Sequence, residues 1–276
     1  MSILFDHVAL AARQRDPIRD FVLDLLGGRV IVEQRSPQTE MGFRGVQIDI
    51  GGALLEVIEP TSPASFLHPF LAKRGPGLHH LTWYVKGLDA FLARLDARGV
   101  ALTGVEHDAD GAATNAFTRP SASFGVLLQF RPHEDKKREK KRNSADWENL
   151  PAPAPNRGKL AATSIAAADG EATLAFFQAT LGGDVSGPTA RGDRVVRTLT
   201  TGGTRLEFVS PADPSGDGER AGGLDAVTFE LTAFAETIAT AEAMGLTVLP
   251  GEDACTRYLA PTNPTGARFR LVDVGG

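Results

Sequence analysis

Histidine is unevenly distributed along this chain of 276 residues, since no histidine follows His133. Imidazole is the commonest metal ligand in proteins, and it also transfers protons near neutral pH. The distribution therefore indicates a metal or acid–base site in the first half of the chain and no equivalent site in the second half. The six histidines are His7, His68, His79, His80, His107 and His133.

Strand alternation selects which of these histidines could act together. Short runs with period-two alternation, bounded by Gly, Pro and Ser, read as strands, and successive side chains of a strand point to opposite faces. This alternation places Phe5 on the same face as His7, and His79 on the face opposite to His80. Away from the more apolar face, four strands each present one donor, and these are His7, Glu56, His80 and Gln129.

Two imidazoles and two oxygen donors suit a borderline divalent cation that keeps open positions for water or substrate. The sequence therefore predicts one divalent metal ion, of Co, Ni, Mn, Zn or Fe, bound by His7, Glu56, His80 and Gln129.

The chain contains an internal duplication, because the second half repeats the pattern of the first. FDHVALAA, LLEVIEPTSP and GVLLQF in the first half correspond to LAATSIAAAD, TRLEFVSPADP and GARFRLV in the second. Loss of a site from one copy explains why the donors are not repeated, and we expect the second copy to be structural and without metal. At the four donor positions the second half has Ser164, Glu207, Ala226 and Arg270.

Each half reads as strand, helix and three strands, twice over. This order predicts an α+β fold of four βαβββ units, in which each half curls its strands into one cup-shaped mixed sheet with helices outside. We expect a metal-binding domain over 1–132 and a degenerate domain over 159–276. Between them, residues 133–158 are charged and then rich in Pro and Ala, which predicts an exposed linker.

The bulk properties exclude several classes of function. A formal charge of −5 gives no support to nucleic-acid binding, and no apolar run approaches the length that spans a bilayer. The single cysteine, Cys255, fits a reducing compartment. We expect a cytoplasmic protein, a monomer or homodimer, that acts on a small molecule without nucleic-acid or membrane partners.

The quoted segments resemble the vicinal oxygen chelate (glyoxalase-like) superfamily, and within it residues 5–131 look most like methylmalonyl-CoA epimerases. The stretch RGPGLHH carries the more specific part of this resemblance. The resemblance implies paired strand–helix–three-strand modules with one metal ligand from each of four cup strands. Carried over position by position, the ligands of that family fall on His7, Glu56, His80 and Gln129.

The chain departs from the epimerase pattern at two places. In the epimerases the last metal ligand is normally a glutamate, whereas this chain has Gln129 there. The epimerases also have a glutamate just before the third strand, and the nearest acidic residue in this chain is Glu40. We expect Glu40 to be the general base, although Asp49, His107 or a metal-bound hydroxide are alternatives. Arg44 and Arg119 are candidates for binding a substrate carboxylate or phosphate.

These residues favour a metal-dependent isomerase, epimerase or glyoxalase-like lyase that forms an enolate-like intermediate from a small carbonyl or acyl-CoA-type substrate. The first alternative is a non-haem iron dioxygenase, because His7, His80 and Glu56 could form its ligand set. Oxygenases of this superfamily, however, take their carboxylate from the last cup strand. The second alternative is a metal-free binding protein of the antibiotic-sequestering kind.

Overall fold

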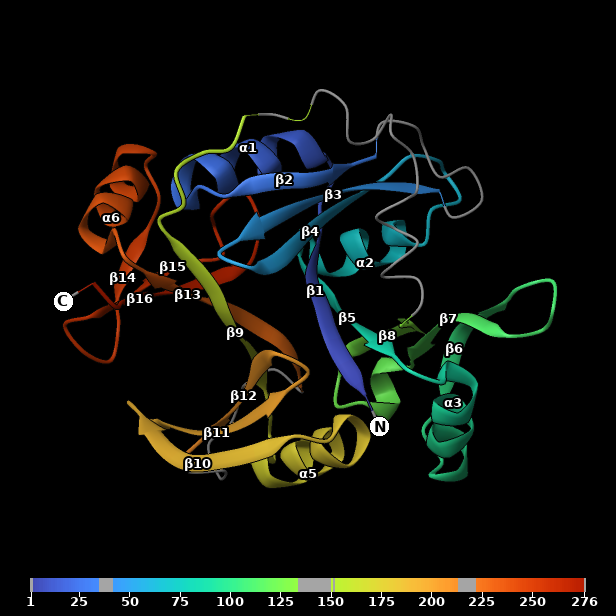
Figure 1. The fold of residues 1–276 in the computed structure, drawn as a ribbon. Coiled ribbons are helices and arrows are strands. Elements are labelled where there is room, and N and C mark those ends of the chain that lie inside the picture. Colours follow the sequence, from blue (N-terminus) through green and yellow to red (C-terminus); the bar gives the residue numbers. More distant parts are fainter. Residues whose placement is uncertain (1, 35–41, 134–149, 151, 213–221, 276) are drawn as a thin grey trace. The chain divides into compact units, whose positions relative to one another are not determined.

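The computed structural model describes residues 2–34, 42–133, 150, 152–212 and 222–275 (Figure 1). The strands of these residues form two open, cup-like mixed sheets with helices against them, as the α+β prediction requires. The first sheet has the order β2-β3-β4-β1-β5-β8-β7-β6, and the second has the order β10-β11-β12-β9-β13-β16-β15-β14. None of the described helices is long and apolar enough to cross a membrane.

The first sheet is built from two βαβββ units, with a helix and a short 3-10 turn added between elements. The first unit contains β1 (Ile3–Ala11), α1 (Arg15–Leu26), β2 (Arg29–Glu33), β3 (Phe43–Ile50) and β4 (Ala53–Pro60), and α2 (Leu67–Arg74) follows it. The second unit contains β5 (Gly77–Val85), α3 (Leu88–Ala97), β6 (Leu102–His107), β7 (Ala113–Thr118), η1 (Pro120–Ala122) and β8 (Leu127–Pro132).

The second sheet repeats this order of elements. Its first unit contains β9 (Gly158–Ala166), α5 (Gly170–Leu181), β10 (Asp184–Arg191), β11 (Arg194–Thr201) and β12 (Thr204–Pro211). Its second unit contains β13 (Gly223–Leu231), α6 (Phe234–Ala243), β14 (Val248–Pro250), β15 (Thr256–Leu259) and β16 (Arg268–Asp273). The predicted duplication and the four βαβββ units are therefore confirmed.

Strand registers show which positions of the two sheets correspond. In the first sheet Thr82 of β5 lies beside Gln129 of β8, and in the second Thr228 of β13 lies beside Arg270 of β16. Both pairs are parallel, and both occupy the same place in the strand order. The register thus makes Arg270 the counterpart of Gln129, as the sequence comparison predicted.

The helices bury apolar side chains and have well-defined ends. The buried residues of α1 include Ile18, Phe21, Val22 and Leu25, and the helix ends at Gly27, whose φ of 71° is available to glycine at little cost. In α5 the side chain of Asp169 accepts hydrogen bonds from the backbone of Glu171 and Ala172, which satisfies two free N–H groups at the helix start. These helices fix the strands that follow them.

The chain packs into two compact units, and each unit combines parts of both sheets. One unit consists of the described residues within Met1–His7, His80–Arg142 and Ala162–Asp225. In it the rings of Phe124 and Phe176 lie 5.5 Å apart, and Gly202 accepts a backbone hydrogen bond of 2.8 Å from Phe5. Residues from the two halves of the sequence therefore share one packed core.

The other unit consists of the described residues within Val8–His79, Asn143–Ala161 and Ala226–Gly276. In it Arg157 donates to the carbonyl oxygen of Asp24 at the end of α1 and forms an ion pair with Glu236 of α6. Ala154 pairs with Gly28 as an isolated β-bridge. The described end of the predicted linker is thus extended and held at α1, whereas residues 134–149 lie outside the described residues. The boundaries 1–132, 133–158 and 159–276 stay a prediction.

Candidate metal centre

β1 and β5 bring two histidines face to face. The rings of His7 and His80 have centroids 5.5 Å apart and planes inclined by 72°. Both side chains are buried, with 3% and 5% of their surface exposed. The outer edge of His80 packs against Phe117 of β7 at 6.0 Å. A pair of imidazoles enclosed in this way is suited to share one cation.

The predicted alternation of β1 is wrong at one position. Phe5 was expected on the His7 face, yet its ring packs on Trp83 at 5.0 Å, whereas His7 meets Thr82. Adjacent residues of a strand point to opposite faces, so Phe5 and His7 contact opposite faces of β5. The alternation of β1 is therefore interrupted across Asp6, as happens where a strand is locally irregular.

Asp6 supports the ring of His7, and sequence reasoning missed it. The Nδ1 atom of His7 lies 2.8 Å from Oδ2 of Asp6, and both side chains are largely buried. A carboxylate on one ring nitrogen orients a ligating histidine and leaves the other nitrogen for the metal. The Nε2 atom of His7 is therefore the ring nitrogen that could bind a metal. An Asp next to a His in a strand would ordinarily point away from it, so alternation gave no signal.

A chain of hydrogen bonds continues from His7 across three strands. The Nε2 atom of His7 lies 2.9 Å from the hydroxyl of Thr82, and that hydroxyl donates to Oε1 of Gln129 at 2.7 Å. The Nε2 atom of Gln129 donates in turn to Oδ1 of Asn115 at 2.8 Å. Thr82 and Asn115 are nearly inaccessible, at 0% and 6% exposure. Thr82 shares the face of His80, so alternation could have found it, whereas Asn115 had no sequence signal.

Glu56 completes the set of charged donors. Its Oε1 accepts a hydrogen bond of 3.2 Å from Nε2 of Gln47, which lies directly opposite it in the β3–β4 ladder. Among the described residues, His7, Glu56 and His80 form a group whose possible ligand atoms all lie within 4.8 Å of one another. Two imidazoles and one carboxylate at this spacing fit a divalent transition metal.

His79 lies against a different set of groups from His80. Its ring contacts Phe70 of α2 at 4.7 Å and Phe66 at 6.0 Å, on the face opposite to His80. Desolvation by this burial lowers the pKa of His79 to about 4, although the Glu56 carboxylate acts in the opposite direction. His79 is therefore a neutral packing residue near pH 7, which makes it a natural control for His80.

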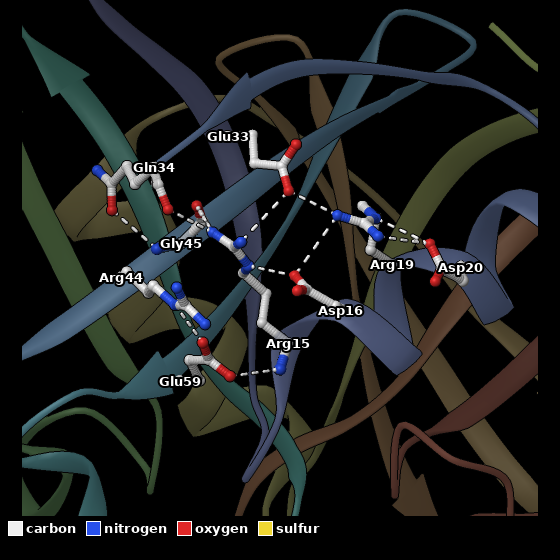
Figure 2. A network of polar contacts seen from close by, with 9 residues as sticks. All are labelled: Arg15, Asp16, Arg19, Asp20, Glu33, Gln34, Arg44, Gly45 and Glu59. Atoms are coloured by element: carbon white, nitrogen blue, oxygen red, sulfur yellow. Dashed lines mark hydrogen bonds and ion pairs between the residues drawn. The ribbon is translucent and has the colours of Figure 1, made fainter. Parts of the chain in front are cut away.

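The predicted substrate-binding and catalytic residues are placed less favourably. Glu40 lies outside the described residues. Arg44 is bonded to Glu59, whose other oxygen accepts a 2.7 Å hydrogen bond from the backbone of Arg15 (Figure 2). Arg119 is exposed, just before η1. The structure thus brings Arg44 into a polar network and leaves Arg119 accessible.

The network of Figure 2 is structural in character. Arg15 is only 2% exposed, and its guanidinium reaches Glu33 at 3.3 Å and the carbonyl oxygens of Gln34 and Gly45 at 2.6 and 3.0 Å. A buried guanidinium is tolerated when its donors are satisfied in this way. The network fastens the start of α1 to β2 and β3, and Arg44 belongs to its edge.

The second sheet fills the equivalent positions with other groups. Glu207 accepts a hydrogen bond of 3.1 Å from the hydroxyl of Ser164, and it forms ion pairs with Arg191 at 2.9 Å and Arg205 at 3.6 Å. On β16, Arg270 forms an ion pair with Glu252, and Tyr258 also donates to that carboxylate. Arg191 and Arg205 therefore supply positive charge beside Glu207.

Comparison with known proteins matches both halves to one family. The models of the glyoxalase/bleomycin resistance protein/dioxygenase superfamily match residues 6–118 and residues 159–271. This chain belongs to that superfamily, and it carries the domain twice.

Individual relatives cover different parts of the chain. An uncharacterized protein of Bacillus subtilis (strain 168), YqjC, is 29% identical over 127 residues, which are 45% of this chain and 89% of that protein. A methylmalonyl-CoA epimerase from Mycobacterium tuberculosis is 27% identical over 46% of this chain and 86% of its own, with a TM-score of 0.40. A mutant 4-hydroxymandelate synthase from Streptomyces coelicolor matches 98% of this chain and 92% of its own at a TM-score of 0.63 and 12% identity. The last match shows a shared fold alone.

Proposed function

We propose that this chain is a metal-dependent isomerase, epimerase or lyase, with one divalent ion held by His7, Glu56, His80 and Gln129. The observation that carries the proposal is the group of His7, Glu56 and His80, whose ligand atoms lie within 4.8 Å of one another. The oriented Nδ1 of His7, bonded to Asp6, adds support, because ligating histidines are held in this way.

The charge of the site indicates the substrate class. Two neutral imidazoles, one carboxylate and one amide around a divalent ion leave a net charge of about +1, which favours an anionic or chelating substrate. A bound ion would act as a Lewis acid that stabilises negative charge on a carbonyl oxygen. Small carbonyl compounds and acyl-CoA-type thioesters, deprotonated beside the carbonyl, fit this chemistry. The methylmalonyl-CoA epimerase likeness is consistent with the thioester.

Other residues of the chain would hold the ligands, remove the proton and bind the substrate. Asp6 holds the ring of His7, and Thr82 and Asn115 hold the side chain of Gln129. Glu40 stays our candidate for the base that removes the proton. Arg119 is the better candidate for a substrate carboxylate or phosphate, because Arg44 would have to give up Glu59 first.

An iron-dependent oxygenase is the second candidate, and one observation favours it. Two histidines and one carboxylate are the ligands of many non-haem iron oxygenases, and His7, His80 and Glu56 lie together. One feature counts against an oxygenase. The last cup strand has Gln129 where oxygenases have a carboxylate, and hydrogen bonds with Thr82 and Asn115 hold its amide in place. We therefore rank isomerase or lyase chemistry first.

The test combines metal identification with proton exchange. We expect purified protein to contain cobalt, nickel, manganese or zinc, and to exchange the proton beside the carbonyl of a 2-methyl-branched acyl-CoA thioester for deuterium in D₂O. Mass spectrometry follows both quantities. Iron together with substrate-dependent oxygen uptake would support the oxygenase, and protein that binds no metal would remove both enzymes in favour of a binding protein.

A further inference from the structure

Hydrogen bonds link the side-chain amide of Gln129, through Asn115, to the backbone carbonyl of Gly104 two strands away. Asn115 of β7 donates from Nδ2 to the carbonyl oxygen of Gly104 in β6 at 3.3 Å, and its Oδ1 accepts from Nε2 of Gln129. The opposite end of the amide, Oε1, accepts from Thr82. We propose that Asn115, aligned by Gly104, is a positioning residue that keeps the oxygen of Gln129, rather than its NH₂ group, turned toward His7. This inference rests on the proposed metal site.

The carbonyl group of Gly104 is the backbone end of this series of hydrogen bonds. The β6–β7 ladder changes register between Thr103 and Glu106, and Gly104 has a φ of 56°. An irregularity of this kind re-aims one backbone group, and glycine accepts the positive φ without strain. A carbonyl oxygen can only accept a hydrogen bond, so Asn115 must present its NH₂ group to Gly104.

The orientation of the Asn115 amide, which Gly104 determines, in turn determines the orientation of the Gln129 amide. Once Nδ2 of Asn115 is engaged, only Oδ1 remains for Gln129, and that oxygen demands a donor. Gln129 must therefore turn its NH₂ toward Asn115 and its oxygen toward Thr82. Turning either amide over would oppose two acceptor oxygens in a buried place, which is costly.

The orientation matters because the two ends of an amide differ as metal ligands. The carbonyl oxygen has lone pairs, whereas the NH₂ nitrogen offers only donors. In the reversed orientation, the oxygen of the Gln129 amide would oppose Oδ1 of Asn115 and its NH₂ group would donate to the hydroxyl of Thr82. Without Asn115 the unfavourable contact would be absent, so the reversed orientation would no longer be disfavoured. The metal would then meet a donor group where it needs an oxygen.

A carboxylate at the same position presents an oxygen at both ends, so it needs no partner to orient it, and Oδ1 of Asn115 would face an acceptor instead of a donor. The effect of Asn115 should therefore depend on whether residue 129 is an amide or a carboxylate. A merely structural asparagine would matter equally in both cases. This dependence separates positioning from packing.

The test measures Co²⁺ affinity and the visible absorption of bound Co²⁺ in full-length protein. We expect Asn115→Val to weaken Co²⁺ binding by about ten-fold, the lower end of what loss of an outer-shell partner costs, and to change the spectrum. In the Gln129→Glu background the same substitution should not weaken Co²⁺ binding, because Oδ1 of Asn115 would face a carboxylate oxygen there. Asn115→Ala provides a second variant, and thermal unfolding checks that each variant is folded.

A matched control comes from the second sheet. Thr256 of β15 lies two residues before Tyr258, which pairs with Arg270 as Phe117 pairs with Gln129, so Thr256 corresponds to Asn115. Thr256→Val should leave Co²⁺ affinity unchanged.

The outcomes separate the two proposals. Equal losses in the amide and carboxylate backgrounds, or no loss with the amide, would overturn the positioning role while leaving the metal site intact. Wild-type protein that binds no Co²⁺ would overturn the metal site itself, and the positioning role with it.

Discussion

Glu56 and Glu207 occupy equivalent places in the two sheets, and the groups around them differ. Glu56 has a possible ligand atom within 4.8 Å of those of His7 and His80, and Gln47 is its hydrogen-bond neighbour. Glu207, only 4% exposed, is surrounded instead by guanidinium groups and a serine hydroxyl. Burying a carboxylate such as that of Glu207 is costly unless a positive charge compensates it, whereas Glu56 is only half-buried. In the second sheet arginine meets this requirement, whereas in the first sheet the carboxylate lies beside two histidines that could share a cation with it.

The last strand of each sheet shows the same contrast. Gln129 belongs to a neutral chain of hydrogen bonds that includes Thr82, whereas Arg270 is paired with Glu252. The hydroxyl of Thr228, which corresponds to Thr82, is buried and has no hydrogen-bond partner among the described residues. In the part of the chain that the structure describes, this chain of hydrogen bonds is therefore found only beside the candidate metal ligands of the first sheet.

Deleting residues 159–276 should have the largest effect, because each compact unit draws on both halves. Trp83 is fully buried, and a side chain added at Gly202 would clash with it, so the β11–β12 turn packs closely on this ring. We expect the remaining fragment to aggregate or dimerise, as judged by size-exclusion chromatography. A monomeric, soluble fragment that retains its metal would contradict the structural role of the second half.

Removing either imidazole should abolish metal binding. We expect about one divalent ion per wild-type chain, and a loss in affinity of more than about 100-fold in His7→Ala or His80→Ala, above the range for outer-shell changes. His79→Ala is the control, because His79 packs on Phe66 and Phe70 instead. Mass spectrometry of bound metal decides the matter, and metal retained in His80→Ala but lost in His79→Ala would reverse the assignment.

Breaking the arginine cluster of the second sheet should affect stability but not metal. Glu207→Gln removes the charge that Arg191 and Arg205 share, and loss of one partner of a buried ion pair costs about 3–5 kcal/mol at most. Urea unfolding should report this loss, while metal content and turnover stay unchanged. A fall in metal content would mean that the two sheets do not differ as described.

Gln129→Glu should strengthen the binding of a divalent cation in the first sheet. A carboxylate in place of a neutral amide strengthens the attraction for a divalent cation, and we expect affinity to rise by about ten-fold, or ~1.4 kcal/mol. Titration calorimetry with Co²⁺ measures the change. A stable variant with unaltered affinity would place Gln129 outside the metal shell.

The Glu252–Arg270 pair should give a small pH effect in the second sheet. Burial raises the pKa of Glu252, but hydrogen bonds and charge from Arg270 outweigh it, so the net shift is below the ordinary value of 4.5. The pair therefore stabilises the fold above pH 4.5 and is lost as pH falls through the lowered pKa. Thermal unfolding of Glu252→Gln should differ from wild type at pH 7 and converge with it in acid.

The architecture and the grouping of His7, Glu56 and His80 could be predicted from the sequence alone. Repeated segments and period-two alternation predicted two sheets of βαβββ units, and they predicted that His7 and His80 face each other away from His79. These features are encoded locally, because periodicity sets which face a side chain occupies. The correspondence of Gln129 with Arg270 followed from the repeat for the same reason.

The tertiary structure decided which partners those side chains meet. The contacts of Asp6 with His7 and of Asn115 with Gln129 are ones that no spacing rule predicts. The contact of Asn115 joins strands whose register is set by folding, and the contact of Asp6 depends on an interrupted alternation in β1. Arg44 and Glu59, by contrast, are direct partners across the β3–β4 hairpin. Periodicity carries the direction of a side chain, whereas its partner depends on register between strands and on local irregularities such as the one at Gly104.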